Sequence, residues 1–216
     1  VGSEMCIRDS IRTEPLQNPV NRLAKRLFDL TFSSLFLLTI FPFMYLIVGL
    51  IIKITSPGPI FFKQERNGEN GKIFKCYKFR SMKVNALSDS LQATKNDPRK
   101  TKFGNFLRKS NLDELPQFIN VFKGEMSIVG PRPHMLKHTE EYSQLINKYM
   151  MRHLVKPGIT GWAQVTGYRG ETKELSQMEG RVRRDLWYIE NWTFLLDIRI
   201  MIKTVTNMFR SEKNAY

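Results

Sequence analysis

The sequence predicts an α+β fold that is mostly helical, with an apolar N-terminal segment that associates with a membrane. Three observations support this fold class. An uncharged apolar run covers Leu30–Ile52 and is long enough to cross a bilayer. Two short stretches with strand character flank a Gly-bearing turn at 67–71. Apolar residues at helical spacing characterise much of the remainder, most clearly over Thr193–Phe209.

The composition indicates an anionic partner and a reducing compartment. The 216 residues carry a formal net charge of +14, which favours a nucleic acid, a phosphorylated substrate or an acidic membrane surface as partner. The two cysteines, Cys6 and Cys76, provide neither a disulfide framework nor a metal-ligand spacing. His134 and His138 lie four residues apart, but no third ligand is evident, so we interpret them as part of a solvated helix face.

We divide the chain into three parts. Residues 1–21 are interpreted as a non-native or disordered leader, because Val1–Ser10 carries no pattern and Ile11–Val20 is polar. An upstream portion of the protein is expected to be missing. Residues 22–55 form the expected membrane segment, and residues 56–216 form the main folded domain.

The apolar run Leu30–Ile52 allows two membrane arrangements. As a helix it measures about 34 Å, but Pro42 lies near its middle and removes a helical hydrogen bond. A spanning helix should show a charge asymmetry, yet basic residues flank both ends, namely Arg22, Lys25, Arg26, Lys53, Lys63 and Arg66. A re-entrant helix that breaks at Pro42 explains both facts, with the Thr39 hydroxyl satisfying backbone groups near the break. A kinked transmembrane helix is the alternative.

Turn signals and periodicity divide the rest of the chain into short elements. Pro57 and Gly58 end the apolar segment, and residues 84–100 form a polar surface excursion. The predicted strands are Ile60–Phe62 and Ile73–Phe79, and the predicted helices are Phe103–Leu107, Phe118–Phe122, Met135–Met151, Glu174–Tyr188 and Thr193–Phe209. The aromatic cluster of Trp187, Tyr188 and Trp192 fits either a membrane-interface belt or the core.

The stretch Ser110–Gln117 places two adjacent carboxylates, Asp113 and Glu114, in one of the most basic parts of the sequence. Pro116 is tolerated only in the first turn of a helix, so Asp113 is predicted to cap the helix that follows. The helix dipole and nearby cations should keep Asp113 ionised. An ionised carboxylate can act as a nucleophile, and its neighbour can hold a magnesium ion. The alternative is that Asp113 only caps the helix.

Two rigid loops follow this stretch. Gly130–Pro133 presents Arg132 between two prolines, and a rigidly held guanidinium suits bidentate binding of phosphate. A solvated arginine in a structural turn is the alternative. Lys156–Trp162 is a second Gly-bearing loop, suited to close approach of a ligand. It matches neither a P-loop nor a dinucleotide fingerprint, so neither nucleotide-binding fold is predicted.

Taken together, these motifs resemble the bacterial sugar transferase family, the monotopic polyprenyl-phosphate phosphoglycosyl transferases. The resemblance runs from Lys25 almost to the C-terminus, and its motifs are Lys25–Asp29, Ser56–Gln64, Tyr77–Met82, Leu112–Gln117, Gly130–Pro133 and Pro157–Gly161. In this family a re-entrant helix commonly breaks at a Ser-Pro pair, where this chain has Phe41-Pro42. The resemblance implies a small membrane-associated catalytic domain behind an N-terminal re-entrant membrane helix.

The resemblance also assigns roles to individual residues. Asp113 matches the family's nucleophile, and Glu114 matches its magnesium ligand and second catalytic carboxylate. The residues expected to bind phosphate or substrate are Lys78, Arg80, Arg108, Arg132 and Asp185.

The implied reaction transfers a sugar 1-phosphate from a UDP-sugar to polyprenyl (undecaprenyl) phosphate and releases UMP, through a covalent aspartyl phosphosugar intermediate. It starts exopolysaccharide, capsule or O-antigen assembly on the cytoplasmic face of the bacterial inner membrane. The stretch Thr160–Thr172 is most similar to the branch that transfers glucose 1-phosphate; galactose and N-acetylated or diamino sugars are the alternatives. Magnesium is the implied cofactor, and an anionic membrane surface is an expected partner.

A non-enzymatic basic membrane anchor or a nucleic-acid binder is the rival interpretation. It uses the same positive charge but gives no reason for an acidic pair inside a basic cluster. The sequence contains no recognised nucleic-acid module, so we expect no nucleic-acid partner. A homo-oligomer is left open.

Overall fold

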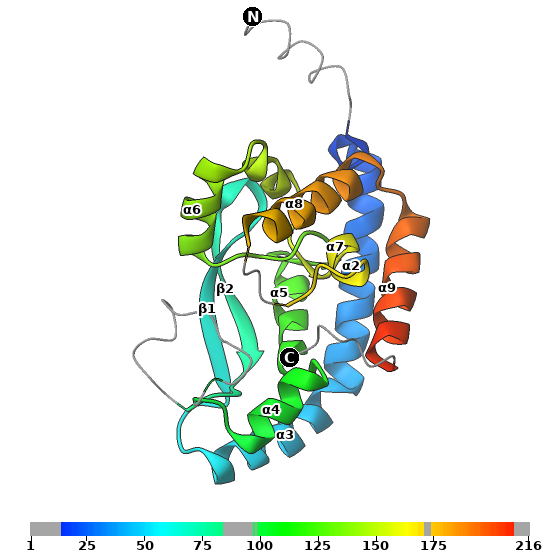
Figure 1. The fold of residues 1–216 in the computed structure, drawn as a ribbon. Helices are drawn as coiled ribbons and strands as arrows, with labels where there is room; N and C mark the ends of the chain where they lie inside the picture. Colours follow the sequence, from blue (N-terminus) through cyan, green and yellow to red (C-terminus); the bar gives the residue numbers. More distant parts are fainter. Residues whose placement is uncertain (1–13, 84–96, 98, 171–173, 210–216) are drawn as a thin grey trace, which may run out of the picture.

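A computed structural model describes residues 14–83, 97, 99–170 and 174–209. Within them the protein is a mostly helical α+β fold with small sheets (Figure 1), as the sequence predicts. Residues 1–13 of the expected leader, and most of the expected excursion at 84–100, lie outside the described residues.

The elements follow one another in short steps along the chain. The helices are α2 (Pro19–Thr39), α3 (Phe41–Thr55), α4 (Lys102–Lys109), α5 (Gln117–Lys123), α6 (Leu136–Leu145), α7 (Trp162–Val165), α8 (Leu175–Glu190) and α9 (Phe194–Phe209). The strands are β1 (Phe61–Asn67), β2 (Ile73–Phe79), β3 (Ser127–Val129) and β4 (Gly158–Thr160). The 3₁₀ turns are η1 (Pro15–Gln17), η2 (Glu69–Gly71), η3 (Leu112–Glu114) and η4 (Tyr149–Leu154).

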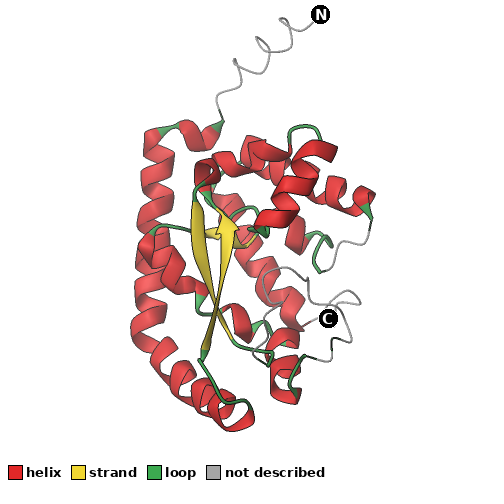
Figure 2. Cartoon of the chain, turned by 90° about the vertical axis from the view of Figure 1, so that its left-hand side faces the viewer, coloured by secondary structure: helices red, strands yellow, loops and turns green. Residues whose placement is uncertain are grey.

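The apolar segment is a bent pair of helices that runs along one side of the molecule and curves beneath it (Figure 2). α2 ends at Thr39 and α3 begins at Phe41, so Pro42 lies in the first turn of α3, where its missing N–H is tolerated. The Thr39 hydroxyl donates to the Leu35 carbonyl at 2.7 Å, which lies in the last turn of α2. Among the described residues no single helix is long and apolar enough to cross a membrane. α2 and α3 together have the length and composition, but they are bent by 55°.

The bent pair has one apolar face that packs on the body and one that is exposed. Val48 and Ile52 of α3 pack with Phe79 of β2 and Leu107 of α4. On the other face, large exposed apolar side chains follow one another across the break; they are Leu35, Leu38, Ile40, Phe43, Leu46, Ile47, Leu50 and Ile54.

β1 and β2 form an antiparallel hairpin that pairs Phe61 with Phe79 and Asn67 with Ile73. The first strand extends beyond the predicted Ile60–Phe62, because polar residues on its exposed face hide a pattern that the backbone pairing makes clear. At the tip of the hairpin, Glu69 forms a 2.8 Å ion pair with Arg22, which lies in the first turns of α2. The hairpin, which follows α3 in the chain, therefore has its tip beside the start of α2.

The main core lies between α2, α5, α8, α9 and β3, and includes Val121, Met126, Val129, Tyr188 and Ile200. Tyr188 and Trp192 belong to this core, whereas Trp187 is 42% exposed and stacks on Trp162. Of the two interpretations of the aromatic cluster, the core is correct for Tyr188 and Trp192.

Two segments predicted as loops contribute strands to a small parallel sheet. β3 and β4 pair Ser127 with Gly158, and each has three residues, too few for periodicity to reveal. A Cβ on Gly158 would lie 2.1 Å from the Gly130 nitrogen, so glycine permits the close approach that fixes the loop after β3.

The predicted helix Met135–Met151 is too long. α6 ends at Leu145 because Ile146 is extended (φ −118°) and Lys148 is left-handed (φ 64°). The solvated face expected for the histidines is also wrong for His134, which is buried before α6 begins and bonds to the Tyr149 hydroxyl at 2.6 Å.

Candidate active site

The Asp-Glu pair lies in a 3₁₀ turn and not at the start of a helix. Asn111 adopts a left-handed conformation (φ 59°), which turns the chain out of α4 and into η3. Pro116 then occupies the N-cap of α5. The prediction that Asp113 caps this helix is therefore wrong, because the cap lies three residues later, at Pro116. The prediction relied on the preference of proline for the first turn of a helix, and the sequence did not show that the chain turns at Asn111.

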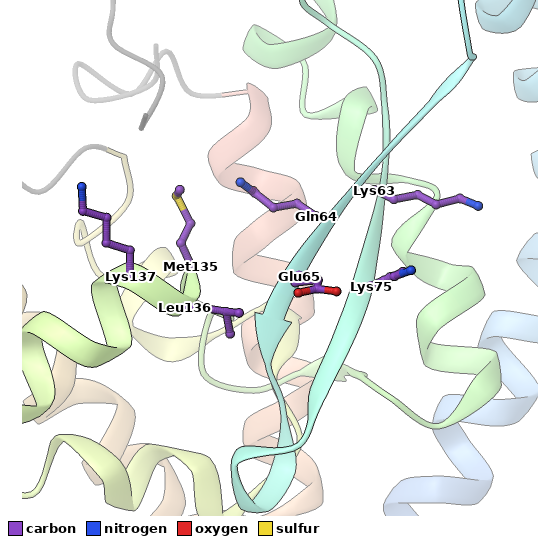
Figure 3. A pocket seen from close by; sticks show the side chains of 7 residues that line it. All are labelled: Lys63, Gln64, Glu65, Lys75, Met135, Leu136 and Lys137. Atoms are coloured by element: carbon purple, nitrogen blue, oxygen red, sulfur yellow. The ribbon is translucent and has the colours of Figure 1, made fainter. Parts of the chain in front are cut away.

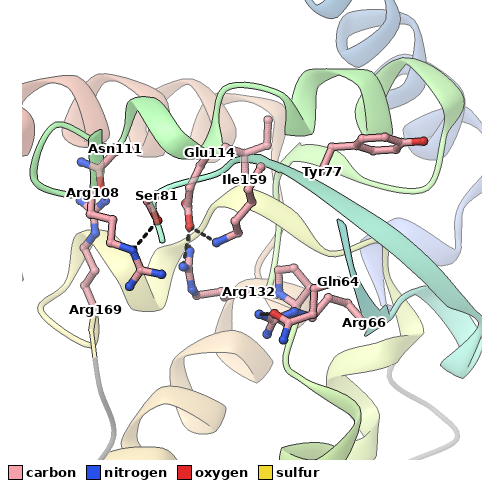
Figure 4. Close-up of polar contacts among 12 residues, drawn as sticks. Gln64, Arg66, Tyr77, Ser81, Arg108, Asn111, Glu114, Arg132, Ile159 and Arg169 are labelled. Carbon is pink, nitrogen blue, oxygen red and sulfur yellow. Dashed lines mark hydrogen bonds and ion pairs between the residues drawn. The ribbon is translucent and has the colours of Figure 1, made fainter. Parts of the chain in front are cut away.

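Glu114 is held by two cations that come from distant elements (Figure 4). Its Oε1 lies 2.7 Å from the Lys78 ammonium of β2 and 2.7 Å from Arg132 Nη2. Arg132 Nη1 also donates to Oε2 at 3.2 Å, so the guanidinium binds both oxygens. Burial opposes ionisation, but Arg132 and Lys78 hold the pKa of Glu114 well below its usual range. The structure thus brings together three of the predicted site residues.

Asp113 is equally buried but lacks such partners. It is 7% exposed, and within the described part of the chain no hydrogen bond or ion pair joins its carboxylate. Burial raises its pKa to about 6, with Lys78 opposing the rise and the charge of Glu114 adding to it. The expectation that the cations would lower this pKa is wrong in direction, because loss of hydration exceeds their attraction.

Arg108 lies near this pair and Arg80 does not join it. Arg108 Nε donates to the Ser81 hydroxyl at 2.8 Å, and its charge favours the ionised form of Asp113. Arg80 is buried and donates to the carbonyls of Ser56 and Pro57, the latter at 3.0 Å. In the structure Arg80 thus holds the turn after α3, and its role in substrate binding stays a prediction.

Asp185 also lies apart from the Glu114 contacts. Its Oδ2 accepts from Arg152 Nη2 at 2.6 Å, and both side chains are almost fully buried. Burial raises the pKa of Asp185, although Arg152 favours its charged form. Its described ion pair is thus with a buried arginine, and its role in substrate binding stays a prediction.

Sequence reasoning missed Arg169, which approaches the site from the loop after α7. Its Nη2 donates to the Asn111 side chain, and Figure 4 shows the two residues beside Arg108. The sequence signal for this residue is its position between two glycines, Gly167 and Gly170, which marks a tight loop. In the structure both glycines have positive φ.

The carboxylate pair is the donor set that a metal ion would find here. Among the described residues no three His, Cys, Asp or Glu side chains gather as a metal site. A hollow of about 320 Å³ lies beside the hairpin (Figure 3), lined by Lys63, Gln64, Glu65, Lys75, Met135, Leu136 and Lys137. Gln64 of this lining accepts a hydrogen bond from Arg66, and Figure 4 shows both residues beside Arg132.

Comparison with known proteins places the chain in a family. The family model described as bacterial sugar transferase matches residues 20–211. The protein named UDP-glucose:undecaprenyl-phosphate glucose-1-phosphate transferase from Escherichia coli strain K12 is 56% identical over 191 residues, covering 88% of this chain and 41% of that protein. Its namesake from Klebsiella pneumoniae is 52% identical over 200 residues, with 92% and 43% covered.

A third protein of the same name, from Xanthomonas campestris pv. campestris, is 52% identical over 196 residues, with 90% of this chain and 40% of that protein covered. The chain thus spans about two fifths of the length of these relatives. The matched region contains the Asp113–Glu114 pair, both cations that hold Glu114, and the bent helix pair. The chain belongs to the bacterial sugar transferase family.

Proposed function

We propose that this protein transfers glucose 1-phosphate from UDP-glucose to undecaprenyl phosphate and releases UMP. The observation that carries the proposal is the asymmetry of the acidic pair: Glu114 is held between Lys78 and Arg132, whereas the Asp113 carboxylate has no such partner among the described residues. The names of the relatives supply the sugar and the lipid.

In the first step the Asp113 carboxylate attacks the β-phosphorus of UDP-glucose. A bond forms between a carboxylate oxygen and phosphorus, the bond to the bridging oxygen breaks, and UMP leaves with that oxygen. A carboxylate is repelled by a diphosphate, so the step needs positive charge around the phosphates. Arg108 and Arg132 are the arginines placed to supply it.

In the second step the phosphate of undecaprenyl phosphate attacks the same phosphorus. The aspartyl bond breaks, the Asp113 carboxylate is restored, and undecaprenyl diphosphoglucose is the product. The pKa of about 6 for Asp113 suits the first step, because the group is mostly ionised at neutral pH and yet is a better nucleophile than a carboxylate of low pKa.

The chemical type of the available ligands suits a magnesium ion. Glu114, together with phosphate oxygens of the substrate, offers the oxygen ligands that this ion prefers, and magnesium sites commonly use only one or two carboxylates. The ion, when bound, would neutralise charge on the diphosphate. Holding it would require Glu114 to share its oxygens with the ion or release one cation toward phosphate.

We infer that residues 22–55 form a re-entrant membrane segment and residues 56–216 the catalytic domain, at the cytoplasmic face of the bacterial inner membrane. The exposed apolar side chains around the break support membrane contact. The Arg22–Glu69 ion pair supports a return to the same side, because it joins the start of α2 to a hairpin that follows α3. The basic chain is suited to an anionic surface, at about 1 kcal/mol for each nearby Lys or Arg.

A UMP-release assay tests the proposal. Purified protein in lipid nanodiscs with undecaprenyl phosphate and magnesium should release UMP faster from UDP-glucose than from UDP-galactose or UDP-N-acetyl sugars. Without lipid acceptor, intact-mass spectrometry should detect one added hexose phosphate, and Asp113→Asn should abolish it. Turnover without any mass shift under rapid quenching would exclude the covalent route, and preference for another UDP-sugar would exclude glucose.

A further inference from the structure

The buried side of the Arg132 loop rests on a second arginine. Arg152, in η4, is 2% exposed. Its Nη2 donates to the main-chain carbonyl of Arg132 at 2.9 Å and to Asp185 at 2.6 Å. Its Nη1 lies 2.6 Å from Nδ1 of His134. One buried guanidinium thus contacts the backbone of the loop, an acidic residue of α8 and the residue that follows Pro133.

The bond to the Arg132 carbonyl adds a tertiary restraint to a loop that its prolines already stiffen. Pro131 and Pro133 have φ set by their rings, and Arg132, which precedes a proline, is restricted to extended φ and ψ. These local restrictions limit the shape of the loop but do not fix where it lies relative to Glu114, and the bond from Arg152 ties its backbone to the buried cluster. Arg152 holds that carbonyl from inside while Glu114 holds the guanidinium from outside.

The other contacts of Arg152 keep it in this position. A guanidinium can only donate, so Nδ1 of His134 accepts from Arg152, and it shares this role with its 2.6 Å contact to the Tyr149 hydroxyl. Asp185 provides the compensating charge that a buried cation requires. A lysine could make one of these contacts as a point charge, but only the planar fork reaches three acceptors in different directions.

We propose that Arg152 is a positioning residue for Arg132, and that Asp185 and His134 act on the reaction through Arg152 and not by touching substrate. The proposal rests on the proposed function, since it assigns the cluster to the positioning of a phosphate-binding arginine. It also gives Asp185 a route to the Arg132 loop, because its ion pair is with the arginine that holds the Arg132 carbonyl.

The test is a double-mutant cycle between Arg152→Gln and Arg132→Gln, read as kcat for UMP release. Arg152→Gln alone should lower kcat by about 100-fold, the size of effect expected when a reacting group is misplaced by about 1 Å. In the Arg132→Gln background it should cost less than about twofold, because the residue that it positions is already gone. Losses that multiply would overturn the proposal.

Val182→Ala is the matched control, since Val182 is buried on the same helix as Asp185 and packs with Tyr149 beside Arg152. It should lower the melting temperature without a coupled loss of kcat. Hydrogen exchange of residues 128–136 supplies a readout that needs no activity: exchange should be faster in Arg152→Gln and unchanged in Val182→Ala.

Two further outcomes are distinguishable. If Arg152→Gln does not fold, Asp185→Asn replaces it in the double-mutant cycle. Asp185→Asn should lower kcat less than Arg152→Gln would, and its effect should again nearly vanish in the Arg132→Gln background. Losses in kcat that multiply would overturn the proposal. If the wild type releases no UMP from any UDP-sugar, the proposed function fails, while the exchange comparison still decides whether Arg152 holds the loop.

Discussion

At the scale of single residues, the chain neighbours Asp113 and Glu114 have opposite surroundings. Both are buried, and burial alone raises the pKa of a carboxyl group. Two ion pairs reverse this effect for Glu114, and among the described residues none does so for Asp113. Environments that push the pKa values of two acidic groups apart are the usual way in which a site divides roles between them. Here one carboxylate is fixed and the other is available to react.

The raised pKa of Asp113 predicts a pH dependence of activity. UMP release in a single turnover should fall about tenfold per pH unit below pH 6 and reach a plateau above pH 7, because Asp113, the proposed nucleophile, has a pKa of about 6. A pH profile of the burst rate measures this. A rate that stays constant down to pH 4.5 would contradict the assignment of Asp113 as nucleophile.

The same shift predicts that Asp113 destabilises the fold at neutral pH. Between its ordinary pKa of about 4 and about 6, the native state keeps a proton that the unfolded state has lost, so the free energy of unfolding falls as pH rises through this window. Asp113→Asn should therefore raise the free energy of unfolding by about 1–3 kcal/mol at pH 8 and change it little at pH 4. Denaturant unfolding at the two pH values measures the difference, and a destabilised Asp113→Asn at pH 8 would argue against it.

Glu114→Gln should behave in the opposite way. The pKa of Glu114 is held low, so its charge contributes stability above its ordinary pKa that is lost as pH falls. Removing the charge leaves Lys78 and Arg132 without a counterion and should cost about 2–4 kcal/mol at pH 8, with severe loss of turnover. Chelation of magnesium by EDTA should abolish turnover of the wild type without this loss of stability. Undiminished activity in EDTA would rule out the metal.

The sequence predicted which residues belong to the site but not how they pair. Lys78 and Arg132 were expected to bind phosphate or substrate, and the structure joins both to Glu114. Arg80 follows Lys78 by two residues and is equally suited to phosphate in the sequence, yet its described contacts are with the carbonyls of the turn after α3. Such contacts join distant segments, and residue types alone do not specify them.

At the scale of elements, α2 is joined to the body through a buried polar cluster. Lys25 of α2 forms a 2.5 Å ion pair with Asp197 of α9, and Asp197 also accepts from the Tyr188 hydroxyl at 2.7 Å and the Trp192 indole at 3.1 Å. Trp192 lies two residues before α9, between it and α8, so side chains from three segments converge on one carboxylate. The early turns of α2 therefore belong to the folded body.

Asp197→Ala is expected to destabilise the protein by about 3–5 kcal/mol, because it leaves the buried Lys25 without its partner. The double variant Lys25→Met with Asp197→Leu should be much closer to wild type, since neither charge is then left alone. Thermal unfolding in the same detergent compares the three proteins. Equal losses in the single and double variants would show that the ion pair is not the source of the stability.

Long periodic elements were predictable, and short ones were not. The helix predicted at Thr193–Phe209 matches α9 to within one residue, because its apolar stripe is continuous. β3 and β4 have three residues each and owe their pairing to glycines that let two backbones meet. Helix boundaries at Asn111 and Lys148 depend on left-handed residues other than glycine, for which the sequence carries only a weak preference.

At the scale of the whole molecule, both ends of the bent helix pair are attached to the same folded body. The first half of α2 is tied to it by Arg26, which donates to the carbonyls of Val121 and Phe122, and α3 packs on it through Val48 and Ile52. Large exposed apolar side chains run along both helices. A membrane-spanning path through Leu30–Ile52 would put the two points of attachment on opposite sides of the membrane, whereas a shallow, bent insertion would keep them on one side.

This arrangement predicts that both ends of the apolar segment face the cytoplasm. Single cysteines at Arg22 and Lys63, in a background without the native cysteines, should react with a membrane-impermeant maleimide in inverted membrane vesicles and not in intact cells. A cysteine at Phe43, which is 70% exposed beside the break, should be protected from the reagent in both preparations because it lies in lipid.

Pro42→Ala restores the N–H that proline lacks and should straighten the segment towards a spanning form, so a cysteine at Lys63 should then be labelled from outside. Labelling of either flank from outside in the unaltered segment would show a spanning helix, and the Arg22–Glu69 ion pair could then not form, since its two partners would lie on opposite sides of the membrane.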